Sequence, residues 1–559
     1  MVTEIELEEK SRKGGLRTMP FIIVNESFEK VASFGLQPNM IIYLMTFYQM
    51  SAATGASVLG IWNALSNGLA IVGAFVADSY LGRFRVVAIG SISTLIGMII
   101  LWLTAMIPQL KSSTFSHFNH ICDAGFVRPC SIIFGADQLE KKEKPENQRL
   151  VDSYFNWYYA SIGISTIFAV TIIIYIQDHY GWQVGFGIPV ILMLLSVSMF
   201  LTGSPFYIKV KAKESLFIGL LQAAVAAFAK GFRNIPFTNF DDCYYYQPHE
   251  SEILEPSNDF RCLNRACMIE DPQQDLNPDG SASNPWTLCS VEQVESLKAL
   301  IRVLPMWSTG ILIFVMTRQF PFSVLQTKTM DRHIFPQLKV PAASFSVFMM
   351  IAFTIWIVFY DRVLVLLLSK YTGQPRGLSP VFRMGFGIIV SCISMALSAI
   401  TENIRRQRAA EEGHKNDPSA LVNISAMWFT PQYALLGVAE AAYSVGQVEF
   451  FYCLLPKSMS SIASAMATTG TAVACLAASV LVSGVDWLSS TRGKTSWLSS
   501  NINRGHLDYY FWLLAFLSLL NFLYFLVVCR FYEPDHERSR LCHEAEEKQC
   551  DYRLLPESS

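Results

Sequence analysis

Residues 31–77 read VASFGLQPNMIIYLMTFYQMSAATGASVLGIWNALSNGLAIVGAFVA, a run of 47 residues without a single Asp, Glu, Lys or Arg. A helix that spans a membrane needs about 20 mostly apolar residues. The run is therefore long enough for two such helices, with a break near residues 51–60. It predicts most of a first membrane helix and a second one.

The rest of the 559-residue chain has the same character. Hydrophobic residues make up 52% of it, charged residues only 16%, and the mean hydropathy is +0.33. Soluble domains carry about 25% charged residues, so the deficit of charge is the larger departure. The formal net charge of -2 has no strong sign and gives no reason to expect a nucleic-acid partner. We therefore expect a polytopic protein embedded in a lipid bilayer.

Further runs with little charge predict the remaining helices. In the first half they cover residues 86–110, 153–177 and 179–208. In the second half they cover residues 299–317, 340–360, 384–401, 418–456, 458–485 and 509–529. The long polar stretch between the halves contains one amphipathic piece near residues 215–230.

This pattern predicts five regions. They are a cytoplasmic N-terminus (1–18), an N-terminal six-helix bundle (19–208), a cytoplasmic interdomain loop (209–298), a C-terminal six-helix bundle (299–532) and a cytoplasmic tail (533–559).

The fourth helix is the weak point of the pattern. Its only candidate is residues 121–136, which contain Asp123 and Arg128. These residues would make about 24 Å of helix, short of the roughly 30 Å hydrocarbon thickness. A crossing is still required, because the turn at 178–181 has no Lys or Arg whereas two other loops are basic and should face the cytoplasm. Those loops carry Arg83, Arg85, Lys141, Lys142, Lys144 and Arg149. The second half departs from the rule that basic loops face the cytoplasm. Four basic residues there fall on the predicted outside: Arg405, Arg406, Arg408 and Lys415.

Two six-helix halves joined by a cytoplasmic loop are the pattern of the major facilitator superfamily, whose halves rock around a site at the bilayer midplane. Six ordered blocks are more specific. They are GGLRTMPFI with NESFEK (14–30), ADSYLGRF (77–84), RPC through FGADQ (128–138), FNWYY (155–159), WTLC through VEQVE (286–295) and GHLDYY (505–510). With them the chain resembles the plant nitrate/peptide transporter family, within the proton-dependent oligopeptide transporters, over residues 14–532.

The resemblance implies a secondary active transporter that moves a small molecule or ion together with protons by alternating access. No cofactor and no metal are implied. An enzyme would need reactive side chains within the membrane, such as a histidine with a polar partner, and the sequence places none there.

Three charges stand at the start of the first helix. Glu26, Glu29 and Lys30 have the spacing i, i+3, i+4, which places them on one helix face. Charges at membrane depth are costly and should face water or one another. In the family the matching acidic-x-x-acidic-basic motif is a proton-coupling site, most often with Arg where this chain has Lys30. The alternative is that the helix begins only after Lys30 and that the three are interfacial.

Two more roles are expected, the first of them implied by the resemblance. Arg128 and Glu440 match residues that bridge the two bundles, and the bridge forms and breaks as the cavity alternates. Asp78 with Arg83 and Arg85 is interpreted as a latch in a cytoplasmic loop.

The substrate is expected to be an anion. Gly163 stands where peptide-transporting relatives usually have Asn, and no acidic residue lies between Lys298 and Thr317. Lys30 or Arg128 remains to attract the negative charge of a substrate, and aromatic side chains are expected to form the walls above it. The candidates are Phe34, Tyr158 and Trp307. Nitrate or a small organic anion fits this set, and transport of di- or tripeptides fits it less well.

Two expectations complete the interpretation. The plasma membrane is expected to hold the protein, rather than the vacuolar membrane. The main alternative function is a non-transporting membrane sensor, or an inactive variant, owing to the shortened fourth helix.

Overall fold

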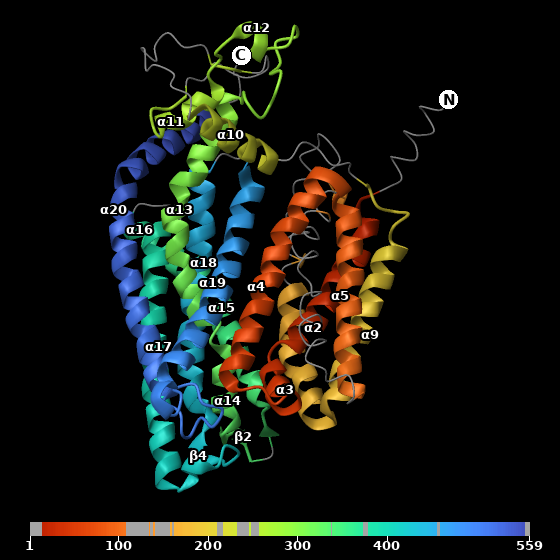
Figure 1. Ribbon diagram of the computed structural model, residues 1–559, viewed down its shortest axis with the longest axis vertical. Coiled ribbons are helices and arrows are strands. Elements are labelled where there is room, and N and C mark those ends of the chain that lie inside the picture. The colour runs from red at the N-terminus through yellow and green to blue at the C-terminus, as the bar shows by residue number, and fades with distance from the viewer. Residues whose placement is uncertain are drawn as a thin grey trace. The chain divides into compact units, whose positions relative to one another are not determined.

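The computed structural model describes residues 14–107, 134, 138–139, 157–158, 161–209, 216–231, 245–247, 256–336, 338–372, 378–455 and 459–553 (Figure 1). The described chain is helical apart from four short strands. Most of the predicted fourth helix, including Arg128, lies outside these residues. Contacts divide the chain into two compact units, 1–212 with 310–446 and 468–523, and 213–309 with 447–467 and 524–559.

The first helix begins well before the uncharged run. In the N-terminal half the helices are α2 (Met19–Leu36), α3 (Met40–Phe47), α4 (Ala52–Val76), α5 (Arg83–Met106) and α9 (Ile174–Thr202), with π-helical turns at Ala77–Leu81 and Ala169–Ile173. Because α2 starts at Met19, the alternative in which the helix starts after Lys30 is wrong. The break predicted near residues 51–60 lies earlier, since the Ser51 hydroxyl accepts a hydrogen bond from the backbone N–H of Thr54 and caps α4.

A glycine marks the turn between the fifth and sixth helices. The helical stretch Ser161–Thr202 is interrupted at Gly181, whose φ of 80° lies in the left-handed region. Glycine adopts that conformation without steric cost. The turn therefore falls where the two predicted spans, 153–177 and 179–208, meet.

Most helices in the C-terminal half extend beyond the apolar runs that predict them, but the run 418–456 is longer than its helix, α18 (Thr430–Leu454), because its first part forms β4 (Val422–Ser425) and a 3-10 turn. The helices of this half are α13 (Val291–Thr317), α14 (Phe320–Lys328), α15 (Val347–Phe359), α16 (Val365–Thr372), α17 (Pro380–Glu411), α18, α19 (Ser460–Ser489) and α20 (Leu507–Arg553). A 3-10 helix at Ala342–Ser346 precedes α15, and a π-helical turn at Tyr360–Leu364 follows it. Hydropathy marks the part that lipid must surround, whereas backbone hydrogen bonds continue into charged turns.

Four strands of two to four residues lie beside these helices. They are β1 (Met330–Asp331), β2 (His333–Phe335), β3 (Leu338–Lys339) and β4 (Val422–Ser425). β1 pairs parallel with β4, and β2 with β3 forms an antiparallel hairpin. The sequence analysis did not predict them, because segments this short carry no alternating pattern.

Eight helical segments of the described chain are long and apolar enough to cross a membrane. They are Ala52–Leu81, Arg83–Met106, Ser161–Thr202, Val291–Lys328, Ala342–Leu368, Pro380–Glu411, Ala465–Ser489 and Leu507–Tyr532. The two helices that carry the predicted working acids, α2 and α18, are not among these eight. Charged side chains lower the mean hydropathy of a helix, so a membrane helix that carries charges is harder to detect by hydropathy.

The first unit contains parts of both halves. α2 packs along α9, and α9 packs against α5 (Figure 1). α14 of the second half contacts α3 and α4 of the first half. One hydrophobic cluster joins the halves, from Leu36 and Tyr43 to Phe345 and Tyr510. This hydrophobic cluster lies at the same end of the unit as Gly181. The charge pattern assigns that end to the outside of the membrane.

The second unit holds part of the interdomain loop. Its helices include α10 (Leu216–Gly231), α11 (Arg261–Asn264) and α12 (Pro272–Asp275), and α10 forms where the amphipathic piece is predicted. The buried Lys298 ammonium donates to the carbonyl of Ser257 at 2.8 Å and to Glu295 Oε1 at 2.7 Å. Arg302 pairs with Asp259. The described part of the loop is therefore anchored by the buried Lys298 ammonium and by a partly exposed ion pair.

Candidate functional site

The first helix carries a compact buried cluster of charge. Lys30 Nζ lies 2.8 Å from Glu26 Oε1 and 2.7 Å from Glu29 Oε2. Ser33 Oγ, one turn further along α2, donates to Glu29 Oε1 at 2.9 Å. The two carboxylates are 1% and 0% exposed, and Lys30 is 6% exposed. The structure thus brings together the three residues that the sequence pattern places on one face.

This arrangement suits a group that gains and loses a proton. Two carboxylates that contact one ammonium repel each other, and a proton on either of them removes that repulsion. A nearby cation favours the ionised form of a carboxyl group, and removal of water favours the neutral form. The balance therefore changes when water reaches the cluster. Lys30 supplies a point charge between the acids, where Arg would supply a planar fork.

A second pair of opposite charges lies in the C-terminal half. Glu440 on α18 is attracted by Arg318, which directly follows α13. The positive charge of Arg318 also interacts electrostatically with Cys475 on α19. Sequence reasoning missed Arg318, because the seventh span was ended at Thr317, one residue before this charge. The signal that could have found it is that uncharged residues continue after Arg318, from Gln319 to Thr327, within the helical segment Val291–Lys328.

The partner predicted for Glu440 cannot be placed. Arg128 lies outside the described residues, so a bridge between Glu440 and Arg128 stays a prediction. What the described residues show is a cation within the same half, Arg318, that acts on Glu440.

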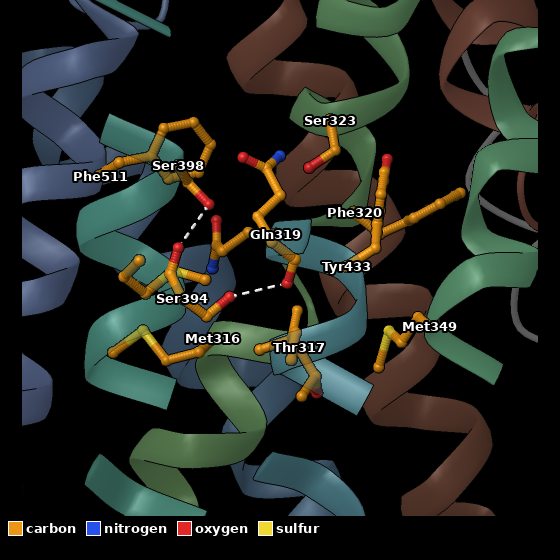
Figure 2. A pocket seen from close by; sticks show the side chains of 13 residues that line it. Met316, Thr317, Gln319, Phe320, Ser323, Met349, Ser394, Ser398, Tyr433 and Phe511 are labelled. Carbon is orange, nitrogen blue, oxygen red and sulfur yellow. Dashed lines mark hydrogen bonds between the residues drawn. The ribbon is translucent and has the colours of Figure 1, made fainter. Parts of the chain in front are cut away.

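A small pocket lined by both apolar and uncharged polar side chains lies inside the C-terminal half (Figure 2). Its lining includes Gln319, Ser394, Ser398, Gln432 and Tyr433, and no charged side chain. Ser394 donates to the carbonyl of Gln432 at 2.9 Å, and Ser398 donates to the carbonyl of Ser394 at 2.8 Å. The space open to the centre of a water molecule is about 20 Å³, and one water needs about 10–15 Å³. The pocket is therefore water-sized and too small for a transported solute.

The two halves touch through neutral hydroxyl groups at the predicted outer end. Ser57 Oγ on α4 lies 2.9 Å from Ser483 Oγ on α19, and Ser479 Oγ donates to the carbonyl of Ser57 at 2.9 Å. A Cβ added to Gly60 would lie 3.0 Å from Ser479 Cβ, so the helices approach closely there. These are contacts that can separate without leaving a bare charge.

One ion pair also links the halves. Arg332 Nη1, next to the β2–β3 hairpin, lies 3.8 Å from Asp178 Oδ2 at the turn after the fifth helix. Asp178 is 44% exposed, so the pair is weak.

A buried network accounts for two of the four basic residues on the predicted outside, Arg405 and Arg406. Glu402 and Arg405 of α17 are both 0% exposed and form a bidentate pair at 2.8 and 2.7 Å. Gln326 Nε2 donates to Glu402 at 2.7 Å, and Arg405 Nη1 donates to Asn503 at 2.7 Å. Arg406 pairs with Asp508 at 3.4 Å. Because their charge is consumed inside the fold, these arginines do not report membrane orientation.

The predicted aromatic walls lie in separate places. Phe34 is half-buried and packs with Val31 and Ile173. Tyr158 is buried in another cluster, which includes Phe134 and Phe200. Trp307 belongs to the second unit, where its indole N–H donates to the carbonyl of Met466 at 2.8 Å. Each has a packing or hydrogen-bonding role in the fold.

The predicted latch is described in part. Arg83 is half-buried at the start of α5, and Arg85 is exposed. Gly82, with a φ of 79°, makes the turn before them. The side chain of Asp78 lies outside what the structure describes, so the latch stays a prediction.

Comparison with known proteins places the chain. A family model described as the POT family matches residues 84–498. The chain is 47% identical to Protein NRT1/ PTR FAMILY 1.2 of Arabidopsis thaliana over 553 residues, 94% of this chain and 91% of that protein. It is 47% identical to Protein NRT1/ PTR FAMILY 1.1 of the same plant, over 94% of this chain and 93% of that protein.

Solved structures agree on the fold. An auto-inhibited POT family peptide transporter matches with a TM-score of 0.68 at 20% identity, over 92% of this chain and 97% of that one. The POT family transporter PepTSo matches with a TM-score of 0.65 at 18% identity, over 93% and 99%. The chain is thus an all-helical, multi-pass membrane protein and not an enzyme: it belongs to the POT family, among the NRT1/PTR proton-coupled transporters.

Proposed function

We propose that this protein takes up nitrate or a small organic anion together with protons, by alternating access, and that Glu26, Glu29 and Lys30 form the proton-coupling site. The observation that carries the proposal is the buried contact of Lys30 with both carboxylates, at 2.8 and 2.7 Å. A proton that binds there changes the charge of the cluster by one. That change is what links proton binding to a cycle between two conformations.

Import of an anion against a negative membrane potential requires a driving ion. Each unit of charge moved across 100 mV costs about 2.3 kcal/mol. More than one proton per monovalent anion makes the transported complex positive, so that the potential then favours uptake. A cluster that can hold a proton beside a substrate site therefore fits anion uptake at a plasma membrane, which is where we place the protein.

The residues favour an anion over a peptide. Between Lys298 and Thr317 the seventh helix offers no carboxylate to a peptide ammonium group, and the next residue, Arg318, is a cation. Among the structural relatives, one peptide transporter POT was solved in complex with sulfate, at 12% identity and a TM-score of 0.61. An anion can thus be bound within this fold.

In this proposal, contacts between the two bundles control the change between the two conformations of the transport cycle. Glu440 pairs with Arg128 in one state of the cycle, and the loop of Asp78, Arg83 and Arg85 latches the cytoplasmic side. That Phe34, Tyr158 and Trp307 contact the substrate stays a prediction.

Uptake by proteoliposomes tests the proposal. Purified protein is supplied with labelled nitrate, a small aromatic monocarboxylate or a dipeptide, at external pH 5.5 and 7.5, with an alkaline lumen. We expect nitrate or the carboxylate to accumulate, and faster at the acidic pH. Accumulation of the dipeptide alone would replace the anion by a peptide, and binding without flux of any solute would favour a sensor.

A further inference from the structure

Arg318, in the turn between α13 and α14, interacts electrostatically with groups near the middle of two long helices. It acts on Glu440, which lies 10 residues after the start of α18 and 14 before its end, and on Cys475, which lies 15 residues after the start of α19 and 14 before its end. Both positions are near the middle of long helices. The guanidinium is therefore at the level where major facilitator proteins hold their substrates.

Arg318 has no side-chain hydrogen bond and no ion pair among the described residues. Its Nε is buried without a hydrogen-bond partner, while the residue as a whole is half-buried. Glu440 attracts it but does not lie within ion-pair distance. A charge at this depth is costly unless it faces water or a partner. An arginine held with a buried donor unused is thus poised for an acceptor that the described part of the chain does not provide.

The other described candidate for an anion site is already occupied. Lys30, which the sequence analysis considered for this role, contacts Glu26 and Glu29. An anion that approached Lys30 would meet two carboxylates. Arg318 is acted on by one carboxylate, Glu440, which lies beyond ion-pair distance, and its chain neighbours Met316, Thr317, Gln319 and Phe320 are neutral.

We propose that Arg318 binds the anionic group of the substrate directly. This inference rests on the anion transport proposed above and names the side chain that recognises the anion. Nitrate and carboxylate are planar and present two oxygens in line, and a guanidinium presents two parallel N–H donors that match them. The bound anion takes up the donor that the fold leaves unused and shields Glu440 from the Arg318 charge.

Two variants and one matched control test the inference. Arg318→Gln removes the charge and the fork, and Arg318→Lys keeps the charge but removes the fork. Arg408→Gln removes a charge of the same kind from a site that is 59% exposed and pairs with Glu411 on the surface. A charge-assisted hydrogen bond contributes about 1.5–3 kcal/mol, so its loss weakens binding by about 10- to 150-fold.

Nitrate uptake is measured against concentration in proteoliposomes, and protection of the purified protein against heat by nitrate is measured beside it. We expect Arg318→Gln to raise KM at least about tenfold and to abolish protection by nitrate. We expect Arg318→Lys to raise KM by less, and Arg408→Gln to leave it unchanged. A lower maximal rate with KM and heat protection unchanged in Arg318→Gln would overturn the inference, because it assigns Arg318 a structural role.

If Arg318→Gln does not yield folded protein, Arg318→Lys decides, since a wild-type KM in that variant also overturns the inference. Failure of the proposed anion transport gives a different result from failure of the role of Arg318. Wild-type protein that accumulates neither nitrate nor a carboxylate removes anion transport before any variant is made. Wild-type uptake of nitrate with an unchanged KM in both Arg318 variants removes only the role of Arg318.

Discussion

Two buried charge clusters in the same unit differ in how their charges are matched. In α17, Glu402 and Arg405 form a one-to-one bidentate pair, and Gln326, Thr329 and Asn503 complete its hydrogen bonds. In α2, Lys30 contacts two carboxylates, Glu26 and Glu29. Both clusters are almost inaccessible to solvent, so burial does not distinguish them.

The difference separates a structural site from a working one. A matched pair with every guanidinium nitrogen engaged has nothing to gain from a proton and holds α17, α14 and the loop before α20 in place. Two acids on one ammonium can take up a proton without leaving a bare charge. In the proposed function, charge stoichiometry rather than burial is therefore the property that distinguishes the proton-coupling site from the structural pair.

The largest effect is expected from neutralising one acid of the α2 cluster. Glu29→Gln keeps the shape and the hydrogen bond from Ser33 but removes the site for the proton. We expect anion uptake driven by a pH gradient to fall to background in proteoliposomes, while the protein remains folded. Unchanged uptake at acidic external pH in this variant would place the coupling elsewhere.

Breaking the matched pair should affect stability. Arg405→Met leaves Glu402 buried and unpaired, which costs about 3–5 kcal/mol. The expected result is a marked fall in the melting temperature of the purified protein. Replacing both residues, as in Glu402→Leu with Arg405→Met, should recover much of the loss, because no buried charge then remains. A single variant as stable as the wild type would contradict the structural role.

Substituting the shared cation sharpens the comparison. Lys30→Arg retains one positive charge between two acids and restores the residue that the family most often has. We expect uptake within a few-fold of wild type, and we expect Lys30→Gln to lose it. Equal loss in both variants, measured at matched protein levels in the liposomes, would show that geometry rather than charge matching governs the cluster.

The smallest effect concerns a third cluster, in which one member titrates near neutrality. Arg406 donates to His506, and Asp508 pairs with Arg406. Burial, and then Arg406, lower the pKa of His506 below its ordinary value. The folded state therefore binds the proton less well than the unfolded state, so stability is full above the ordinary pKa and decreases as the pH falls below it.

We expect a small decrease in melting temperature between pH 7.5 and 5.5, and a smaller one in His506→Gln. The comparison uses the same buffers and detergent for both proteins. An identical pH dependence in the two would show that His506 does not contribute.

Much of the fold could be predicted from hydropathy. The charge-free run at 31–77, the two halves and the amphipathic helix α10 all follow from apolar length and composition. Helix ends could not, because α13 and α17 continue through charged turns that pack in the protein. The small strands β1–β4 depend on contacts between segments about 90 residues apart in one pair, which no local pattern reports.

The candidate site was predictable where it is local. Glu26, Glu29 and Lys30 are neighbours on one helix, so spacing alone places them on one face. The matched pair of Glu402 and Arg405 has helical spacing too, but its burial depends on Gln326 and Asn503 from distant segments. Arg318 was missed because a charge was taken as the end of a span, whereas the helical segment continues after the turn at Arg318 into α14.

The central claim is that the α2 cluster couples protons to the anion, and one measurement tests it most directly. Proteoliposomes with a pH-sensitive dye in the lumen, and with the membrane potential clamped by potassium and valinomycin, receive nitrate outside. Wild-type protein should acidify the lumen as nitrate enters, and Glu29→Gln should not. Nitrate entry through wild-type protein without acidification, or equal acidification in Glu29→Gln, would contradict the claim.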